Sequence, residues 1–338
     1  MPGANSVTSN QETLHKDLEK VVRKYARTTF LRPIAEHTRK AFAEAEEFVR
    51  KFYAGNGNPG INANTRNNGW GKPQPLWLGH IHTRVWMQHS PSEVVPPLRS
   101  EDDKCWETSG TEKDGAGTAT RAVILDSGCG TGESTIHIAR RFPNIPVIGI
   151  DKSEVRLDKA GNPSQTAGED VPTNAFWIRA ELLDFWRLAL DRVKAGKWTI
   201  PYHAVFYPNP WPKQSEATRR FHMHPIFPTL LALGQTTELR TNWEIYAREF
   251  AEAAKIVYEE STRISAKELY GSPSSLRSVE DDSREDCSVE DGDSGDNGGM
   301  LQMTIKCESF EATAPETAFE RKYKEARQKL WRVTISRT

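Results

Sequence analysis

The sequence predicts an α/β fold in which a mostly parallel, seven-stranded sheet is covered by helices on both faces. Three observations lead to this prediction. From residue 121 onward, short apolar runs rich in β-branched residues alternate with segments of helix length. A cluster of glycines follows the first of these runs, where a strand would turn sharply into a helix. Two further strand-like runs lie near the C-terminus.

Five of the apolar runs have the length of buried strands, and the segments that follow them have helical character. The predicted strands are 122–126, 146–150, 175–180, 203–207 and 236–240. The predicted helices are 132–142, 153–160, 182–195, 215–222 and 243–259. Leu301–Cys307 and Leu330–Ile335 are expected to close the sheet as an antiparallel pair at one end.

The chain is expected to divide into a helical N-terminal extension with a linker, residues 1–120, and an α/β domain, residues 121–338. Helices are predicted at 11–28 and 34–53, and the rest of the extension is expected to be partly disordered. Residues 272–299 hold nine acidic and two basic residues, a net charge of −7. Such a segment cannot bury a core, so it is predicted to be a disordered insertion. Because the whole chain carries −1, the remainder carries +6, which is compatible with a polyanionic partner.

Composition excludes several classes of protein. No apolar run approaches the length of a membrane span, so no membrane association is expected. The four cysteines form no CxxC pair, so neither a metal site nor a disulfide framework is predicted. This cysteine usage favours a reducing compartment. We take the cytoplasm as the default location, with the nucleus and organelles left open.

Gly128, Gly130 and Gly132 form a Gly-x-Gly-x-Gly loop directly before a predicted helix. Glycines let the backbone turn and approach a ligand closely, and the helix N-terminus offers free N–H groups. A dinucleotide fingerprint needs a glycine at position 133, where Glu133 stands, and a glutamate there would repel a pyrophosphate. A cofactor without phosphate is therefore favoured. S-adenosylmethionine, with its sulfonium, amino acid end and ribose, fits this requirement.

Acidic residues stand at the ends of the first three predicted strands. Asp126 precedes the glycines and is well placed for the amino acid end of the cofactor. Asp151 ends the second strand, where an acid can accept hydrogen bonds from both ribose hydroxyls. Glu181 follows the third strand and is expected near the adenine, although an acid that stabilises a helix N-terminus would look the same.

The fourth predicted strand runs into Pro208-Asn209-Pro210-Trp211-Pro212. In open α/β sheets, ligands bind beyond the carboxyl ends of the strands. Prolines on both sides restrict the backbone of Asn209 and would place its side chain rigidly. Asn209 is therefore a candidate catalytic and cofactor-contacting residue, and a proline-rich turn without function is the alternative.

In these features and in two further segments, the chain resembles the tRNA (guanine-N7)-methyltransferase family. The match covers about residues 121–335, apart from the acidic insertion, and four segments carry it in order. They are the glycine loop, Phe206–Lys213 followed by Arg219-Arg220, Thr241–Ala247, and Thr317-Ala318-Phe319-Glu320-Arg321. The resemblance implies a Rossmann-like class I methyltransferase fold and methyl transfer from S-adenosylmethionine to guanine N7 in the tRNA variable loop.

The resemblance also implies roles for particular residues. Asp126, Asp151 and the region of Glu181 would hold the cofactor, and Asn209 stands at the position assigned to catalysis. Substrate contacts are expected from residues near the same edge of the sheet: Lys213, Asn242, Thr317 and Glu320. Lys213 and three arginines could meet RNA phosphates, although each arginine could also be an ordinary solvated charge: Arg219, Arg220 and Arg321.

Two departures from the family keep other functions open. The family has aspartate where this chain has Asn209 and Asn242, and its basic run is replaced here by residues 214–218. A methyltransferase of the same lineage with a different RNA or small-molecule substrate is one alternative. A catalytically weak or inactive protein that binds RNA or serves as a scaffold is another. An accessory protein subunit is also compatible with the sequence.

Overall fold

The computed structural model describes residues 11–55, 119–160, 170–270 and 303–337. Within these residues the centre of the fold is a seven-stranded sheet with the order β4-β3-β2-β6-β7-β9-β8. Five strands are parallel: β2 (Ile124–Ser127), β3 (Val147–Asp151), β4 (Ala175–Arg179), β6 (Tyr202–Phe206) and β7 (Thr236–Thr241). The antiparallel strands β9 (Leu330–Arg337) and β8 (Met303–Phe310) close one end. The predicted α/β fold class is therefore confirmed.

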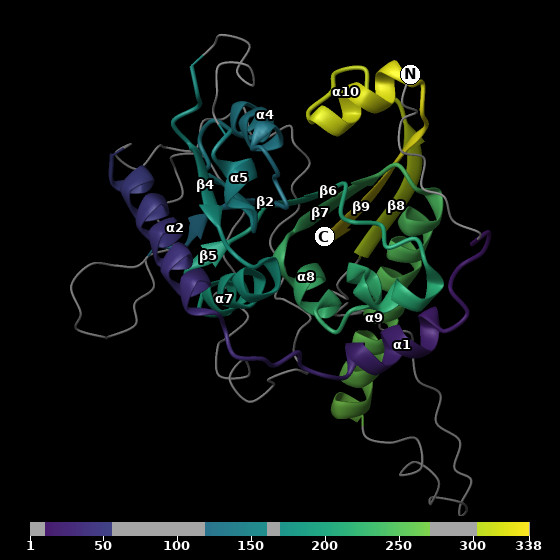
Figure 1. Cartoon of the computed structure of the whole chain (residues 1–338). Coiled ribbons are helices and arrows are strands. Elements are labelled where there is room, and N and C mark those ends of the chain that lie inside the picture. Colours follow the sequence, from purple (N-terminus) through teal and green to yellow (C-terminus); the bar gives the residue numbers. More distant parts are fainter. Residues whose placement is uncertain (1–10, 56–118, 161–169, 271–302, 338) are drawn as a thin grey trace, which may run out of the picture.

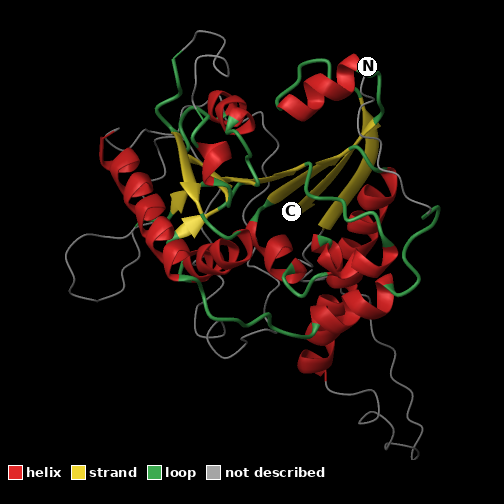
Figure 2. Ribbon diagram, in the orientation of Figure 1, coloured by secondary structure: helices red, strands yellow, loops and turns green. Residues whose placement is uncertain are grey.

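Helices cover both faces of this sheet, as Figure 2 shows. The central strands β2, β3 and β6 are buried along their whole length, which explains their nearly continuous apolar sequence. The helices of the domain are α4 (Glu133–Arg141), α5 (Glu154–Leu157), α7 (Leu182–Lys194), α8 (Phe227–Leu233), α9 (Glu244–Tyr270) and α10 (Ala318–Glu325). A separate two-stranded parallel pair is formed by β1 (Arg121–Ala122) and β5 (Trp198–Thr199). No helix in the described ranges has the length and apolarity needed to cross a bilayer.

The seven long strands lie within a few residues of their predicted positions, but several helices differ. Helices α8 and α10 and the β1–β5 pair were not predicted. The single helix predicted at 215–222 is wrong: two short 3₁₀ helices, Gln214–Arg219 and Phe221–Met223, replace it. Between them the backbone of Arg220 is extended, and its side chain enters a buried ion pair. An uninterrupted α-helix would not place the side chain there.

The N-terminal helices belong to the same core as the sheet. Helices α1 (Leu18–Ala26) and α2 (Glu36–Gly55) contribute Leu18, Val22 and Phe42 to the main cluster of buried apolar residues. The ring of Phe42 packs against Phe185 of α7 with their centroids 5.0 Å apart. Figure 1 shows α2 beside α7 and α1 beside α9. The expected linker and the acidic insertion at 272–299 lie outside the described residues.

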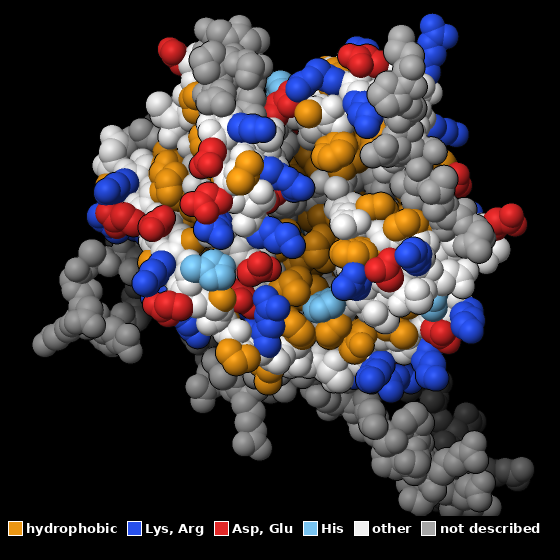
Figure 3. Space-filling view, in the orientation of Figure 1, with side chains coloured by type: hydrophobic (Ala, Val, Ile, Leu, Met, Phe, Trp, Pro, Cys, Tyr) orange, Lys and Arg blue, Asp and Glu red, His pale blue; other side chains and the backbone are white. Residues whose placement is uncertain are grey.

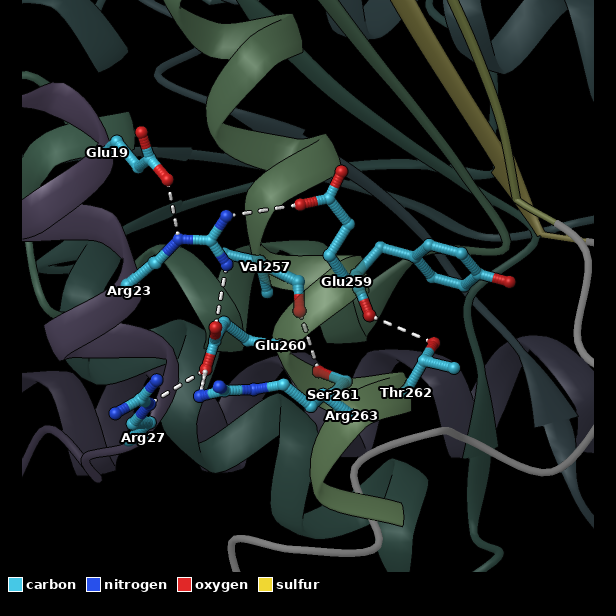
Figure 4. A network of polar contacts seen from close by, with 10 residues as sticks. Glu19, Arg23, Arg27, Val257, Glu259, Glu260, Ser261, Thr262 and Arg263 are labelled. Atoms are coloured by element: carbon cyan, nitrogen blue, oxygen red, sulfur yellow. Dashed lines mark hydrogen bonds and ion pairs between the residues drawn. The ribbon is translucent and has the colours of Figure 1, made fainter. Parts of the chain in front are cut away.

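A network of ion pairs joins α1 to α9 (Figure 4). The carboxylate of Glu260 is only 1% exposed and accepts hydrogen bonds from Arg23 at 2.7 Å, Arg27 at 2.7 Å and Arg263 at 3.1 Å. Burial alone would raise the pKa of Glu260, but the hydrogen bonds from Arg27 and Arg23 outweigh it and lower that pKa to about 2. The ionised form is thus favoured in the folded protein.

Because the folded pKa of Glu260 lies below its ordinary value of 4.5, the carboxylate stabilises the fold above that pH. This contribution is lost as the pH falls toward 2. We predict that Glu260→Gln lowers the free energy of unfolding at pH 7 by about 1–3 kcal/mol. The difference from the wild type should shrink below pH 4.5, as measured by urea denaturation.

Glu259→Gln is the matched control for this substitution. Glu259 is adjacent, but it is 45% exposed and lies 3.4 Å from Arg23. Removing its charge should change stability by less than about 1 kcal/mol. Equal effects of the two substitutions would show that the buried network does not join α1 to α9 as described.

Candidate active site

The glycine loop between β2 and α4 has a conformation that only glycine adopts freely. Gly128, Gly130 and Gly132 have φ angles of +81°, +60° and +82°. A Cβ on Gly132 would collide with the indole of Trp177 on β4 and with the Ala160 side chain. A Cβ on Gly130 would meet nothing within 4 Å. Gly132 therefore allows close packing against Trp177 of β4, whereas Gly130 faces open space that a ligand can enter.

Asp126 lies at the end of β2 with one carboxylate oxygen unsatisfied. Its Oδ2 accepts hydrogen bonds from Ser134 Oγ at 2.6 Å and Thr135 Oγ1 at 2.7 Å. Its Oδ1 is buried and has no hydrogen-bond partner among the described residues. Burial raises the pKa of this carboxyl to about 6, although the two hydroxyls oppose the shift. An unpaired buried carboxylate oxygen is costly, and a bound ammonium group would relieve that cost. This geometry fits the amino acid end of S-adenosylmethionine.

Asp151 fixes the loop to the end of β3. Its Oδ2 accepts from the backbone N–H of Gly130 at 3.0 Å, and its Oδ1 accepts from Ser153 N at 2.8 Å. A carboxylate has about four acceptor positions, so these two bonds leave capacity for further donors. The strand register places Asp151 next to the carboxyl end of β2, where ribose hydroxyls would complete its hydrogen bonding.

Glu181 stands on the same edge, at the N-terminus of α7 just after β4. Its side chain makes no capping hydrogen bond. Its backbone N–H instead donates to Thr38 Oγ1 of α2 at 3.2 Å. The N-terminal part of the chain therefore helps to shape the region where the adenine is expected, a contribution the sequence did not reveal.

The turn after β6 has an unusual backbone. Tyr207 and Trp211 have φ angles of +49° and +44°, a region that bulky residues rarely occupy. Between them Asn209 is exposed, and its Oδ1 accepts from Trp211 N at 3.4 Å. Strained residues persist only where their surroundings hold them, and they cluster at functional sites. The exposed Asn209 at the carboxyl end of β6 is consistent with a site residue.

Helix α10 carries the Thr317–Arg321 motif over this edge of the sheet. Thr317 caps the helix by accepting from Glu320 N at 3.1 Å, and the Glu320 carboxylate accepts from Glu316 N at 2.7 Å. Glu320 also accepts from Tyr207 O–H and from Arg240 Nη1, both at 3.0 Å. Thr317 and Glu320 were expected to contact the substrate. That contact stays a prediction; in the structure both residues are buried and together fix α10 to the turn that begins at Tyr207.

The predicted phosphate-binding cations have different environments. Arg220 is 0% exposed and paired with Glu249, so its contact with the substrate stays a prediction that this burial does not favour. Arg321 pairs with Glu133, which joins α10 to the helix that follows the glycine loop. Lys213 and Arg219 are exposed, and Arg219 lies 4.3 Å from the centroid of the Trp211 ring.

One edge of the sheet thus gathers most of the predicted site. Asp126 and Asp151 lie at the ends of β2 and β3, and Asn209 and the partly buried Asn242 follow the neighbouring strands β6 and β7. Figure 1 shows α4 and α10 at this same edge. Figure 3 shows charges of both signs mixed across the face in view, rather than one continuous basic stripe. The edge could accommodate a cofactor beside β2 and β3 and a second ligand beside the β6 turn.

Sequence reasoning missed two groups that shape this site. Trp177 packs against the glycine loop, and only its place on the third strand could have indicated this role. Arg240 is buried beside Glu238 and Glu320, at 2.6 and 3.0 Å. Its position at the end of a predicted strand was the one available signal.

Comparison with known proteins shows which proteins this chain is similar to. The family described as "Putative methyltransferase" matches residues 120–280. A tRNA (guanine-N(7)-)-methyltransferase of Neisseria meningitidis serogroup C is 31% identical over 137 residues, which are 40% of this chain and 54% of that protein. One from Neisseria gonorrhoeae is 28% identical over 190 residues, 53% of this chain and 76% of that protein. The chain thus spans about half the length of the first of these relatives.

A solved structure, that of the 16S rRNA methyltransferase KamB, is similar with a TM-score of 0.37 at 14% identity, covering 64% of this chain and 88% of that one. The fold described above and the family match define a Rossmann-like methyltransferase. Within this class, the similarities support a divergent member of the tRNA (guanine-N7)-methyltransferase family.

The open space at Gly130 leads to a prediction about cofactor binding. An added methyl group at Gly130 would enter the space that the cofactor needs. We predict that Gly130→Ala folds but binds S-adenosylmethionine at least about 10-fold more weakly, as measured by equilibrium dialysis.

Gly196→Ala is the matched control, because Gly196 has φ +66° and also has nothing within 4 Å of an added Cβ. It carries the same backbone strain but lies between α7 and β5. It should bind the cofactor as the wild type does. Normal binding by Gly130→Ala would place the cofactor elsewhere.

The raised pKa of Asp126 predicts a pH dependence. A cationic amino group binds the ionised carboxylate, so affinity for S-adenosylmethionine should fall as the pH drops below about 6. Asp126→Asn should bind about 10- to 100-fold more weakly at pH 7.5 and lose this pH dependence. Asp191→Asn, which removes an exposed carboxylate on α7, should behave as the wild type. A pH dependence that persists in Asp126→Asn would contradict this assignment.

Proposed function

We propose that this protein transfers a methyl group from S-adenosylmethionine to tRNA and forms 7-methylguanosine in the variable loop. The observation that supports this most is the arrangement of one sheet edge. There, the unsatisfied Oδ1 of Asp126 and the glycine loop follow β2, and the turn formed by residues 207–211, with the exposed Asn209 at its centre, follows the neighbouring strand β6. We call this turn the Asn209 turn. Family membership favours guanine N7 as the acceptor.

Asp126, Asp151 and the glycine loop would hold the cofactor. Asp126 would bind its amino group, and Asp151 its ribose hydroxyls. When bound, S-adenosylmethionine supplies a methyl group on a sulfonium centre. The residues of this chain then have to bind and orient the two reactants in line, which is the main source of rate in such a reaction.

Guanine N7 carries a lone pair and no proton, so no general base is needed. A bond forms between N7 and the methyl carbon as the carbon–sulfur bond breaks, and the positive charge moves from sulfur to the guanine. Asn209 would direct its amide oxygen toward the developing charge. An aspartate at this position would stabilise that charge more strongly. We therefore propose a slow but functional site.

An exposed aromatic ring beside the turn supports an RNA substrate. Phe319 is 54% exposed, and its ring stacks on Tyr207 with centroids 5.8 Å apart and an interplanar angle of 28°. Unpaired bases stack readily on exposed aromatic rings. Lys213 and Arg219, which are exposed near the same turn, could neutralise phosphates.

A second candidate function is methyl transfer to a different RNA or small-molecule acceptor. Asn209 and Asn242 favour it, since both lack the negative charge that the family places there. An amide at Asn209 could accept a hydrogen bond from an exocyclic amine as readily as it could face a charged guanine.

The test is to incubate the protein with labelled S-adenosylmethionine and bulk tRNA, and to digest the RNA and identify the methylated nucleoside. The proposal predicts 7-methylguanosine. Label in another nucleoside would favour the second candidate. Cofactor binding without transfer to any RNA would favour an inactive RNA-binding or scaffold protein.

Restoring the acid at position 209 separates the two enzymatic candidates. If guanine N7 is the acceptor, Asn209→Asp should raise the rate of 7-methylguanosine formation by up to about 100-fold, since one such electrostatic contact is commonly worth ~3 kcal/mol. Asn209→Ala serves as the control and should lower it. No gain in Asn209→Asp would indicate a site tuned to another acceptor.

A further inference from the structure

A fully buried cluster of charged and polar groups lies behind the Asn209 turn. Arg220 and Glu249 are both 0% exposed, and Arg220 Nη1 lies 2.6 Å from Glu249 Oε2. His222 Nε2 lies 2.9 Å from the same oxygen. The other oxygen, Oε1, accepts from Gln11 Nε2 at 2.6 Å and from His15 N at 2.8 Å. Both oxygens of Glu249 are therefore used, and one is bound by the N-terminal segment.

The guanidinium of Arg220 also reaches the turn itself. Its Nε and Nη2 donate to the backbone carbonyl oxygen of Trp211 at 3.2 and 3.0 Å. Nη2 also donates to Gln11 Oε1 at 3.1 Å. A planar guanidinium holding one carbonyl with two donors fixes both its distance and its direction.

Trp211 is the residue that most needs such support. Its φ of +44° is costly for a bulky side chain. Its N–H donates to Asn209 Oδ1, while its carbonyl is held by Arg220. Arg220 thus holds the residue whose N–H is bonded to Asn209.

We propose that Arg220 and Glu249 are positioning residues that hold the Asn209 turn in its active conformation, and that Gln11 and the His15 amide complete this clamp from the N-terminal segment. The catalytic part of this proposal rests on the proposed function. Arg220 then acts through the backbone of Trp211 rather than by touching RNA. Breaking a buried ion pair costs stability, and such a pair has a specific geometry. Both properties suit an element that must hold one conformation.

Arg220→Lys tests the clamp directly. Lysine keeps the positive charge beside Glu249 but cannot hold Glu249 and the Trp211 carbonyl with a planar fork. We expect kcat for tRNA methylation to fall between about 10- and 100-fold, because small misplacements near the reacting atoms have effects of this size. KM for tRNA and affinity for S-adenosylmethionine should stay within about twofold of the wild type, since uniform binding is unchanged.

Hydrogen–deuterium exchange gives a readout that does not depend on activity. In Arg220→Lys, the peptide covering residues 206–216 should exchange faster than in the wild type, while the glycine-loop peptide stays unchanged. Gln11→Ala removes only the N-terminal part of the clamp and should show a smaller change of both kinds. It also keeps the test decisive if Arg220→Lys does not fold. Arg248→Lys, on α9 next to Glu249 but 53% exposed, should not alter exchange in the turn.

Three results would overturn the proposal. Unchanged exchange in the turn of both Arg220→Lys and Gln11→Ala would show that the clamp does not hold it. Faster exchange with unchanged kcat would show that the clamp has no catalytic role. A rise in KM alone, with a weaker salt dependence of tRNA binding, would restore Arg220 as a phosphate contact. If the wild type methylates no tRNA, the proposed function fails, whereas the exchange data still test the clamp.

Discussion

The site depends on one constraint at the end of β2, where a buried carboxylate and a left-handed glycine loop meet. Asp126 cannot satisfy its Oδ1 from within the described protein. The loop that follows is held by the bond from Gly130 N to Asp151. In the proposed complex, a ligand beside Gly130 would meet Asp126 and Asp151 together. Two acids would then be in place before any cation or hydroxyl arrives, and this preorganisation would reduce the cost of binding.

The acceptor side of the site is built differently, by long-range support of a strained turn. The hydroxyl of Tyr207 donates to Glu320 of α10, and Arg220 donates to the backbone carbonyl oxygen of Trp211. Arg321 then joins α10 to Glu133 at the start of α4. Helix α10, which carries the C-terminal motif, thus contacts both the start of α4 and Tyr207.

Much of this could be predicted from the sequence, since it depends on local patterns. The strands, the glycine loop and the acids at the strand ends follow from apolar runs and turn chemistry over a few neighbouring residues. Helix α8 was missed because its apolar sequence lacks helical periodicity. The segment 214–223 was predicted as one helix because its composition allows it, and a tertiary contact of Arg220 decided otherwise.

The roles of single polar residues were harder to predict. Glu320 and Arg220 stand in motifs that point toward a substrate, yet each is buried by partners remote in sequence. Arg220 meets Gln11, 209 positions away, and Glu320 meets Tyr207, 113 positions away. Nothing in the local sequence distinguishes a buried positioning arginine from a solvated phosphate contact. Glu133 is paired with Arg321, which weakens its repulsion of a phosphate-bearing cofactor. Asp126 and the similarity to the family are therefore the stronger support for S-adenosylmethionine.

The most direct measurement is a crystal structure of the protein soaked with S-adenosylhomocysteine, the demethylated product. We expect the amino group of this compound to lie within hydrogen-bond distance of Asp126 Oδ1. Its ribose hydroxyls should donate to Asp151, and its thioether sulfur should face the Asn209 turn. A ligand bound elsewhere, or one that leaves the Oδ1 of Asp126 without a partner, would contradict it.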